Sequence, residues 1–274
     1  MSCNTPNTID IQGHRGCRGL MPENTLQAFK KALELGVHTL ELDLVVSKDN
    51  VVVVSHEPYM NSVICWDANG NEILKSDEKN HNLYQMIFDS IKQYDCGTKF
   101  HPRFPGQEKF KAYKPSLEEV IKASKSLNPN IKFNIEIKAE PKYDGIFTPK
   151  PREFVKLVLD VINQNNAFIE TNLQSFDVRI LEEIKRQESK MKVALLVDED
   201  ETIDDKLAKL SFKPEIISPY FKLLSKEIVA QYQKEHYQII PWTVNDVDDM
   251  QQMIDFNVDG IITDYPDRLV EILK

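Results

Sequence analysis

Three acidic residues in two apolar stretches are the first candidates for chemistry. Glu41 and Asp43 alternate with leucines in the run 39–44, so the two-residue period of a strand places both carboxylates on one face. Glu136 alternates with isoleucines in the run 131–137. Two carboxylates about 5 Å apart repel by about 3 kcal/mol at an effective dielectric constant of about 20, so three of them need a counter-charge. Oxygen ligands without a thiolate predict one divalent cation, Ca²⁺ or Mg²⁺, and leave the choice between the two open.

Two histidines and two basic residues accompany the carboxylates. A bound cation would balance the acidic charge and leave Arg15 and Lys138 free for a substrate anion. His14 ends the first apolar run, His56 follows a run of valines, and imidazole is suited to proton transfer near neutral pH. The remaining histidines are interpreted as surface or satisfied core residues: His38, His81, His101 and His236.

Apolar runs and amphipathic stretches alternate along most of the chain. The expected strands are 9–13, 38–45, 131–137, 168–173, 192–197, 215–218, 238–242 and 258–262. The expected helices are about 24–36, 151–166, 177–189, 202–210, 225–236, 246–255 and 266–273, and one more that begins after Ser116. Ser116 is a plausible N-cap with Glu119 as its capping-box partner. Strand–helix alternation of this kind predicts a TIM (β/α)₈ barrel, an α/β fold with a parallel sheet.

The candidate residues converge at one end of this barrel. Reactive residues of such barrels lie at the C-terminal ends of the strands, which is where the acidic residues, His14 and Lys138 fall. The valines at 51–54 come too soon after the second strand for a parallel crossover, so we expect them to return antiparallel as a hairpin. That hairpin would bring His56 to the same end of the barrel. Convergence distinguishes this set from histidines and carboxylates that occur by chance.

The segment 57–115 lacks the barrel periodicity. It is rich in polar residues and aromatics, and loops of this length are usually functional lids or disordered. The aromatics favour an ordered cap over the active site. We therefore predict a single barrel domain over 1–274 with an inserted cap at about 57–115.

Composition limits the partners and the compartment. The 274 residues are 41% hydrophobic and 28% charged, which suits a soluble globular chain, and the net charge of −9 argues against nucleic-acid binding. We see neither a signal peptide nor a transmembrane segment, and expect a cytoplasmic protein, or a periplasmic or secreted one if a leader has been removed. The oligomeric state is not predicted. The widely spaced cysteines predict no disulfide scaffold and suit a reducing compartment, and Cys17 is interpreted as a packing residue: Cys3, Cys17, Cys65 and Cys96.

Several short motifs resemble those of the glycerophosphodiester phosphodiesterase family. They are GHRG at 13–16, PENT at 22–25, ELDL at 41–44, VVSHEP at 53–58, IEIK at 135–138, PWTVN at 241–245 and DGIITDYPD at 259–267. They follow the family's order and span nearly the whole chain. One departure is Glu57, where the family commonly has aspartate, and we expect only a small change in the orientation of the preceding histidine.

The resemblance implies hydrolysis of a small-molecule glycerophosphodiester to glycerol 3-phosphate and an alcohol. By position, the metal ligands would be Glu41, Asp43 and Glu136, the acid/base pair His14 and His56, and the phosphate-binding residues Arg15 and Lys138. We take His14 as the base and His56 as the acid, with either a glycerol hydroxyl or water as the nucleophile. Trp242 would contact the glycerol carbons or pack at the rim.

Two alternatives stay open from the sequence. One is a barrel phospholipase D-like enzyme that acts on lysophospholipids, although the mixed charges of 57–115 favour water-soluble substrates. The other is a non-catalytic phosphate-binding barrel, which would need neither histidine.

Overall fold

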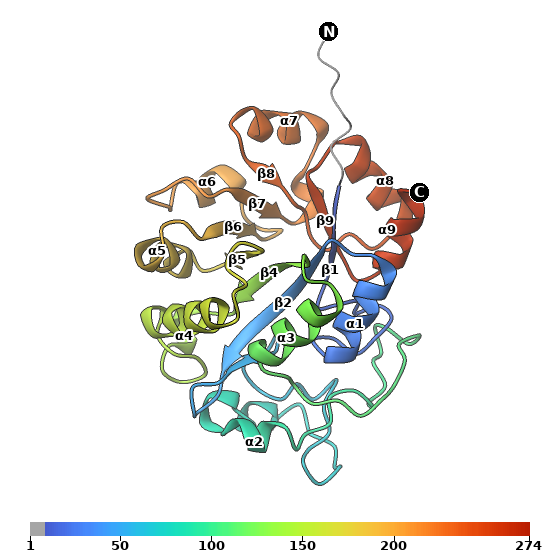
Figure 1. Cartoon of the computed structure of the whole chain (residues 1–274), viewed down its shortest axis with the longest axis vertical. Coiled ribbons are helices and arrows are strands. Elements are labelled where there is room, and N and C mark those ends of the chain that lie inside the picture. Colours follow the sequence, from blue (N-terminus) through green and yellow to red (C-terminus); the bar gives the residue numbers. More distant parts are fainter. Residues whose placement is uncertain (1–8) are drawn as a thin grey trace.

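The computed structural model describes residues 9–274. In it, parallel strands surround a common centre (Figure 1). Within that range the eight barrel strands are β1 (Asp10–Gly13), β2 (Thr39–Val46), β4 (Lys132–Ile137), β5 (Thr171–Ser175), β6 (Lys192–Val197), β7 (Ile216–Pro219), β8 (Gln238–Ile239) and β9 (Gly260–Thr263). The pairing order is β8-β7-β6-β5-β4-β2-β1-β9. Backbone hydrogen bonds from Asp259 to Ile239 (2.9 Å) and from Ile262 to Pro241 (3.0 Å) join the two ends. The predicted TIM barrel is confirmed.

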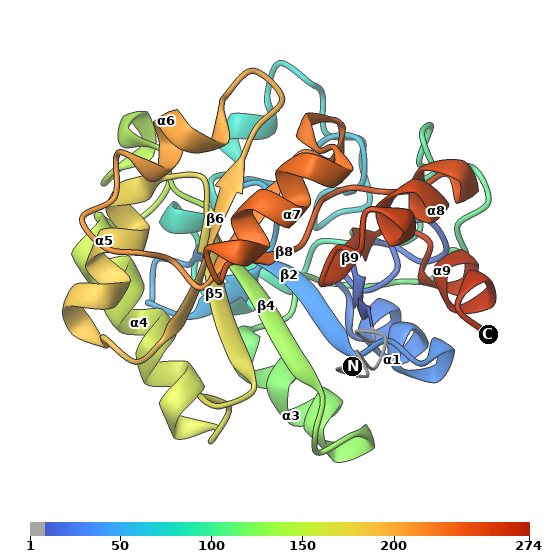
Figure 2. The same cartoon turned by 90° about the horizontal axis from the view of Figure 1, so that it is seen from above.

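Helices pack against the outer face of the strands, as Figure 2 shows from the side. They are α1 (Leu26–Leu35), α3 (Leu117–Leu127), α4 (Pro151–Gln164), α5 (Val178–Gln187), α6 (Ile203–Leu207), α7 (Lys226–Lys234), α8 (Val247–Asp255) and α9 (Pro266–Ile272). Short 3₁₀ turns follow β4 and β7, at Pro141–Tyr143 and Phe221–Leu223. The predicted capping box is present at the start of α3, since the side chains of Ser116 and Glu119 each accept the other's backbone N–H.

The hairpin predicted from the valine run is confirmed. β3 (Val52–Val54) pairs antiparallel with β2, with Leu44 opposite Val54 and Val46 opposite Val52. Val54 also donates its backbone N–H to the carbonyl of Pro115, which brings the end of the insertion back to the barrel.

Most strands begin and end within two residues of the prediction, and two strands differ by three residues at one end. β5 covers 171–175 rather than 168–173, because a turn from Phe168 to Thr171 precedes it. β8 is regular only at 238–239 rather than 238–242, because Pro241 cannot donate a ladder hydrogen bond. Beyond β8 the chain still lies beside β7, because Trp242 and Tyr220 form a parallel β-bridge.

Residues of β2 alternate between two environments. Leu40, Leu42 and Leu44 are fully buried in the core between strands and helices. Glu41 and Asp43 point the other way and are 2% and 1% exposed, so the barrel interior holds them away from water. The predicted separation of the two faces is confirmed.

The insertion forms an apolar cluster of its own on one side of the barrel, around α2 (Phe88–Ile91) (Figure 1). It also holds 3₁₀ turns at Glu78–Asn80 and Leu83–Gln85. Cys65 and Cys96 form a disulfide within it, so the prediction that the cysteines carry no disulfide is wrong for this pair. The two cysteines lie 31 residues apart, and only the folding of the insertion back on itself brings them together.

The other cysteine predictions have different outcomes. Cys17 is fully buried beside α1, where its thiol donates to the carbonyl of Ala28, and burial raises its pKa to about 12. It therefore packs rather than reacts, as expected, whereas Cys3 lies outside the described residues. Over residues 9–274 no helix has the length and apolar character needed to cross a membrane.

Candidate active site

Three carboxylates meet inside the barrel at the predicted position. In the register of the parallel strands, Asp43 of β2 lies beside Glu136 of β4. Each of Glu41, Asp43 and Glu136 offers an oxygen within 4.8 Å of those of the other two, and all three are buried. Burial and the two neighbouring carboxylates raise the pKa of Glu41 well above its usual range.

The cluster fits a hard divalent cation. Its ligands are all carboxylate oxygens, which Mg²⁺ and Ca²⁺ prefer. Asp43 Oδ1 is buried without a hydrogen-bond partner, whereas Asp43 Oδ2 accepts from Asn24 at 2.9 Å. The backbone N–H of Arg15 (3.0 Å) and the side chain of Gln174 (3.0 Å) hold the carboxylate of Glu41. An unpartnered buried oxygen beside two other carboxylates is an arrangement that a bound cation stabilises.

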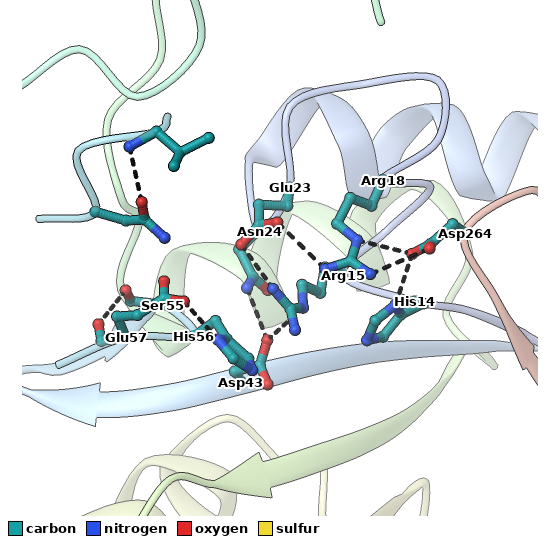
Figure 3. A network of polar contacts seen from close by, with 12 residues as sticks. His14, Arg15, Arg18, Glu23, Asn24, Asp43, Ser55, His56, Glu57 and Asp264 are labelled. Atoms are coloured by element: carbon teal, nitrogen blue, oxygen red, sulfur yellow. Dashed lines mark hydrogen bonds and ion pairs between the residues drawn. The ribbon is translucent and has the colours of Figure 1, made fainter. Parts of the chain in front are cut away.

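His14 is oriented by a carboxylate from the far end of the chain (Figure 3). Its Nδ1 lies 2.6 Å from Oδ1 of Asp264, which follows β9. An ionised carboxylate can only accept, so Nδ1 carries the proton and Nε2 is left with its lone pair. Nε2 lies 3.9 Å from Glu41, at the edge of the acidic cluster. Burial, with Arg18 and Arg15 nearby, lowers the pKa of His14 to about 4 even though Asp264 opposes the shift.

His56 has the same arrangement on the hairpin side. Its Nδ1 lies 2.9 Å from Glu57, and its Nε2 lies 3.1 Å from the ammonium of Lys138. An ammonium group can only donate, so Nε2 accepts and Nδ1 donates to Glu57. Lys138 also contacts Glu136 at 2.8 Å, which links His56 to the acidic cluster. Glu57 thus orients the imidazole although the family commonly has aspartate there.

Two carboxylates hold the side chain of Arg15, which therefore does not project freely. Its guanidinium contacts Glu23 at 2.8 Å and Asp43 at 3.1 Å, and its backbone lies in the left-handed region with φ 50°. Arg18 contacts Asp264 at 2.9 Å and stacks over Phe104 of the insertion. Figure 3 shows Arg15, Arg18 and their carboxylate partners Glu23, Asp43 and Asp264 beside His14.

A cavity of about 550 Å³ brings these groups together. Among its walls are His14, His56, Arg15, Lys138, Glu41, Glu136 and Trp242, so all the sequence-predicted residues except Asp43 line it directly. Trp242 donates its indole N–H to the carbonyl of Ser218 and packs edge-on against Phe176. The insertion adds Asn61, Val63, Ile64, His101, Arg103 and Phe104 to the walls.

Comparison with known proteins decides the family. The model of the glycerophosphoryl diester phosphodiesterase family matches residues 14–268. The chain belongs to this family. A glycerophosphodiester phosphodiesterase of Caldanaerobacter subterraneus is 29% identical over 96% of the chain and 97% of its own length. The predicted enzyme class, a phosphoric diester hydrolase, is therefore confirmed. The alternative of a non-catalytic phosphate-binding barrel is not supported.

Solved structures agree with the family. A protein of Silicibacter pomeroyi has a TM-score of 0.89 and 29% identity, over 98% of this chain and 94% of its own. A phosphodiesterase of Oleispira antarctica in complex with the product sn-glycerol-3-phosphate shares the fold, with a TM-score of 0.76 and 19% identity over 96% of each chain.

Sequence reasoning missed some residues of this phosphodiesterase site. Asp264 and Glu23 belong to quoted motifs, DGIITDYPD and PENT, yet neither had a role assigned. His101, interpreted from the sequence as a surface or satisfied core residue, lies in the cavity wall and packs on Phe104 with 4.8 Å between ring centres. The signal for Asp264 was its place just after the last strand, where barrel side chains face the mouth.

Proposed function

We propose that this phosphodiesterase hydrolyses glycerophosphodiesters to glycerol 3-phosphate and an alcohol, with a divalent cation held by Glu41, Asp43 and Glu136. The observation that carries the proposal is the pairing of two imidazoles. His14 and His56 line one cavity beside the acidic cluster, and each has its Nδ1 fixed by a carboxylate. Each therefore presents Nε2, the atom that can take or give a proton at the substrate.

The protonation steps follow from this orientation. His14 Nε2 would accept the proton of the nucleophile, which is either water or the neighbouring glycerol hydroxyl, the latter giving a cyclic phosphate that water then opens to glycerol 3-phosphate. Asp264 would stabilise the imidazolium that forms, since its carboxylate is 2.6 Å from Nδ1. In the free site His56 Nε2 accepts from Lys138. Once Lys138 donates to the phosphate instead, Nε2 would take up a proton from solvent and give it to the departing alkoxide.

The phosphate would lie between the basic residues and the acidic cluster. Arg15 and Lys138 line the cavity and carry positive charge towards it. The cation, when bound, supplies Lewis-acid stabilisation of the negative charge that develops on the phosphate oxygens. Ca²⁺ and Mg²⁺ both suit the three carboxylates that would hold the cation.

The insertion 57–115 is proposed to select substrates as part of the single barrel domain. Six of its residues line the catalytic cavity in addition to Glu57, and Gln107 anchors it to the carbonyls of Arg18 and Met21. Trp242 is proposed to contact the carbon atoms of the substrate from the opposite wall. A small water-soluble ester, rather than a lipid, fits a cavity with this many charged walls.

The disulfide favours one of the two compartments expected from the sequence. Disulfides such as Cys65–Cys96 persist mainly in oxidising environments, so we propose a periplasmic or secreted location in place of the cytoplasmic one. Mass spectrometry of protein alkylated during cell lysis tests this. Alkylated Cys65 and Cys96 would contradict it.

A coupled assay tests the function itself. Glycerol 3-phosphate released from glycerophosphocholine is oxidised by glycerol 3-phosphate dehydrogenase, with and without EDTA. We expect NADH formation that EDTA abolishes and that Ca²⁺ or Mg²⁺ restores. Release that persists in EDTA would exclude the metal, and an absence of release with every ester and ion would exclude the function.

A further inference from the structure

A second cavity of about 730 Å³ adjoins the catalytic one, and we call it the side chamber. It is formed by residues 56–59 after β3, residues 138–143 after β4 and residues 198–206 around the start of α6. The walls that both cavities share are His56, Glu57, Glu136, Lys138, Phe176 and Trp242. His14 lines only the catalytic cavity, so the side chamber opens beside His56.

Charge changes sign along the side chamber. Its inner end, next to the catalytic cavity, holds Lys138. Lys206 is also buried there, but it forms an ion pair with Glu201 and adds no net charge. The outer end carries Glu140, Asp198 and Asp200, all exposed. Lys142 pairs with the first of these at the surface, where such a pair is worth little.

Aromatic rings also line the side chamber. Tyr59 and Trp242 face the side chamber, and within residues 9–274 no lysine or arginine lies over either ring. Phe176 differs, because Lys138 and Lys206 lie 5.7 and 5.2 Å from its ring centre. These two rings are therefore not already engaged by a basic side chain of the described residues, and aromatic rings attract cations.

The walls are fixed in place before any ligand binds. Arg179 holds Asp144 at 2.8 Å, and Asn82 of the insertion donates to the carbonyl of Ile146 at 2.8 Å. Tyr59 and Tyr143 both pack edge-on against Phe147, with 6.2 and 5.2 Å between ring centres. A chamber held by contacts of this kind does not need to be ordered by its ligand.

We propose that the side chamber binds the leaving alcohol of the substrate and selects a short alcohol that carries a cationic nitrogen. A diester of such an alcohol has a negative phosphate and, one two-carbon spacer away, a positive amine. This arrangement matches Lys138 in the wall shared with the catalytic cavity, and the aromatic rings and exposed carboxylates that line the rest of the side chamber. The inference rests on the proposed function, because that function places the phosphate at Lys138.

The test compares two esters with the same glycerol 3-phosphate part, one with a cationic and one with a neutral leaving alcohol. With the metal-loaded chain, kcat/KM is measured for glycerophosphocholine and for glycerophosphoglycerol, and their ratio is the readout. The chamber variant combines Glu140→Gln, Asp198→Asn and Asp200→Asn. The control variant removes three exposed carboxylates from the outer helices α1, α3 and α8 and changes the net charge equally: Glu34→Gln, Glu118→Gln and Asp248→Asn.

We expect the wild type to prefer the choline ester by about eightfold or more, at about twofold per rim carboxylate. The ratio should fall by about eightfold in the chamber variant and by less than about twofold in the control. A wild type that prefers the glycerol ester, or equal ratios in the two variants, would overturn the proposal. If neither ester is hydrolysed, the proposed function is wrong. Calorimetric titration of both esters into the wild type and the chamber variant then shows independently whether the side chamber binds the choline ester more tightly than the glycerol ester.

Discussion

Replacing Asp264 with asparagine keeps His14 in the site but removes the carboxylate that orients its imidazole. The carboxylate accepts from His14 Nδ1 at 2.6 Å, from Arg18 at 2.9 and 3.1 Å, and from Asn245 at 2.9 Å (Figure 3). An amide has one accepting oxygen and one donating nitrogen. If the oxygen faces His14, the nitrogen meets donors of Arg18 and Asn245. If the nitrogen faces His14, Nδ1 must accept, and the proton moves to Nε2.

The size of the effect follows from the charge that is lost. Asp264 and a protonated His14, with charge centres about 4 Å apart, attract by about 4 kcal/mol at an effective dielectric constant of about 20. Loss of that attraction in the transition state corresponds to a fall in kcat of about 10³-fold. The same substitution leaves Arg18 with a weaker partner, and we expect the free energy of unfolding to fall by about 2–4 kcal/mol.

Activity and stability must therefore be measured separately. The rate of glycerol 3-phosphate release is taken well below the unfolding temperature, the unfolding free energy from urea titration, and the tautomer from long-range ¹H–¹⁵N spectra of His14. Asp10→Asn is the matched control, because Asp10 holds Thr39 and Lys132 at the opposite end of β1. It should lose stability but keep its rate within about threefold. An Asp264→Asn enzyme with less than tenfold loss of kcat, or with an unchanged tautomer, would refute the reasoning.

Three further predictions concern the acid, the metal and the disulfide. His56→Ala should lower kcat for the choline ester by about 10²–10⁴-fold yet lose far less on a p-nitrophenyl ester, whose leaving group needs no proton; equal losses on both would reject its role as the acid. Glu41→Gln should abolish activity but raise the unfolding free energy of the metal-free protein by about 1–2 kcal/mol, by relieving repulsion; thermal melts with and without Ca²⁺ should show a shift only in the wild type. Replacing Cys65 and Cys96 by serine should lower the unfolding free energy in urea by about 3–4 kcal/mol, given their separation of 31 residues, and a loss below 1 kcal/mol would contradict it.

The acidic cluster was predictable because it depends on local rules. A period of two in β2 and β4 gives each carboxylate its face, and the parallel register of neighbouring strands sets Asp43 beside Glu136. Repulsion between the carboxylates then indicates a cation without knowledge of any distance. The hairpin was predictable for the same reason, since the connection before Val52 is too short for a parallel crossover.

The partners of the histidines and the form of the insertion were not predictable in this way. Asp264 and His14 are 250 residues apart, and their contact exists only because β9 closes the barrel beside β1. His101 reaches the cavity because the insertion folds around its own apolar cluster and disulfide, neither of which leaves a periodic signal. Tertiary contacts within an irregular segment decide where such residues lie.

The two histidines are oriented so similarly that orientation alone does not tell the base from the acid. Their surroundings support the proposed assignment. His14 lies next to Glu41, lines only the catalytic cavity and has a lowered pKa, so it remains neutral and ready to accept a proton. His56 is more exposed, lines both cavities and contacts the ammonium of Lys138. If the leaving alcohol occupies the side chamber, its oxygen departs towards His56. The choice of acid and base made from the sequence then follows from where the alcohol goes, and loss of the side-chamber preference would remove its support.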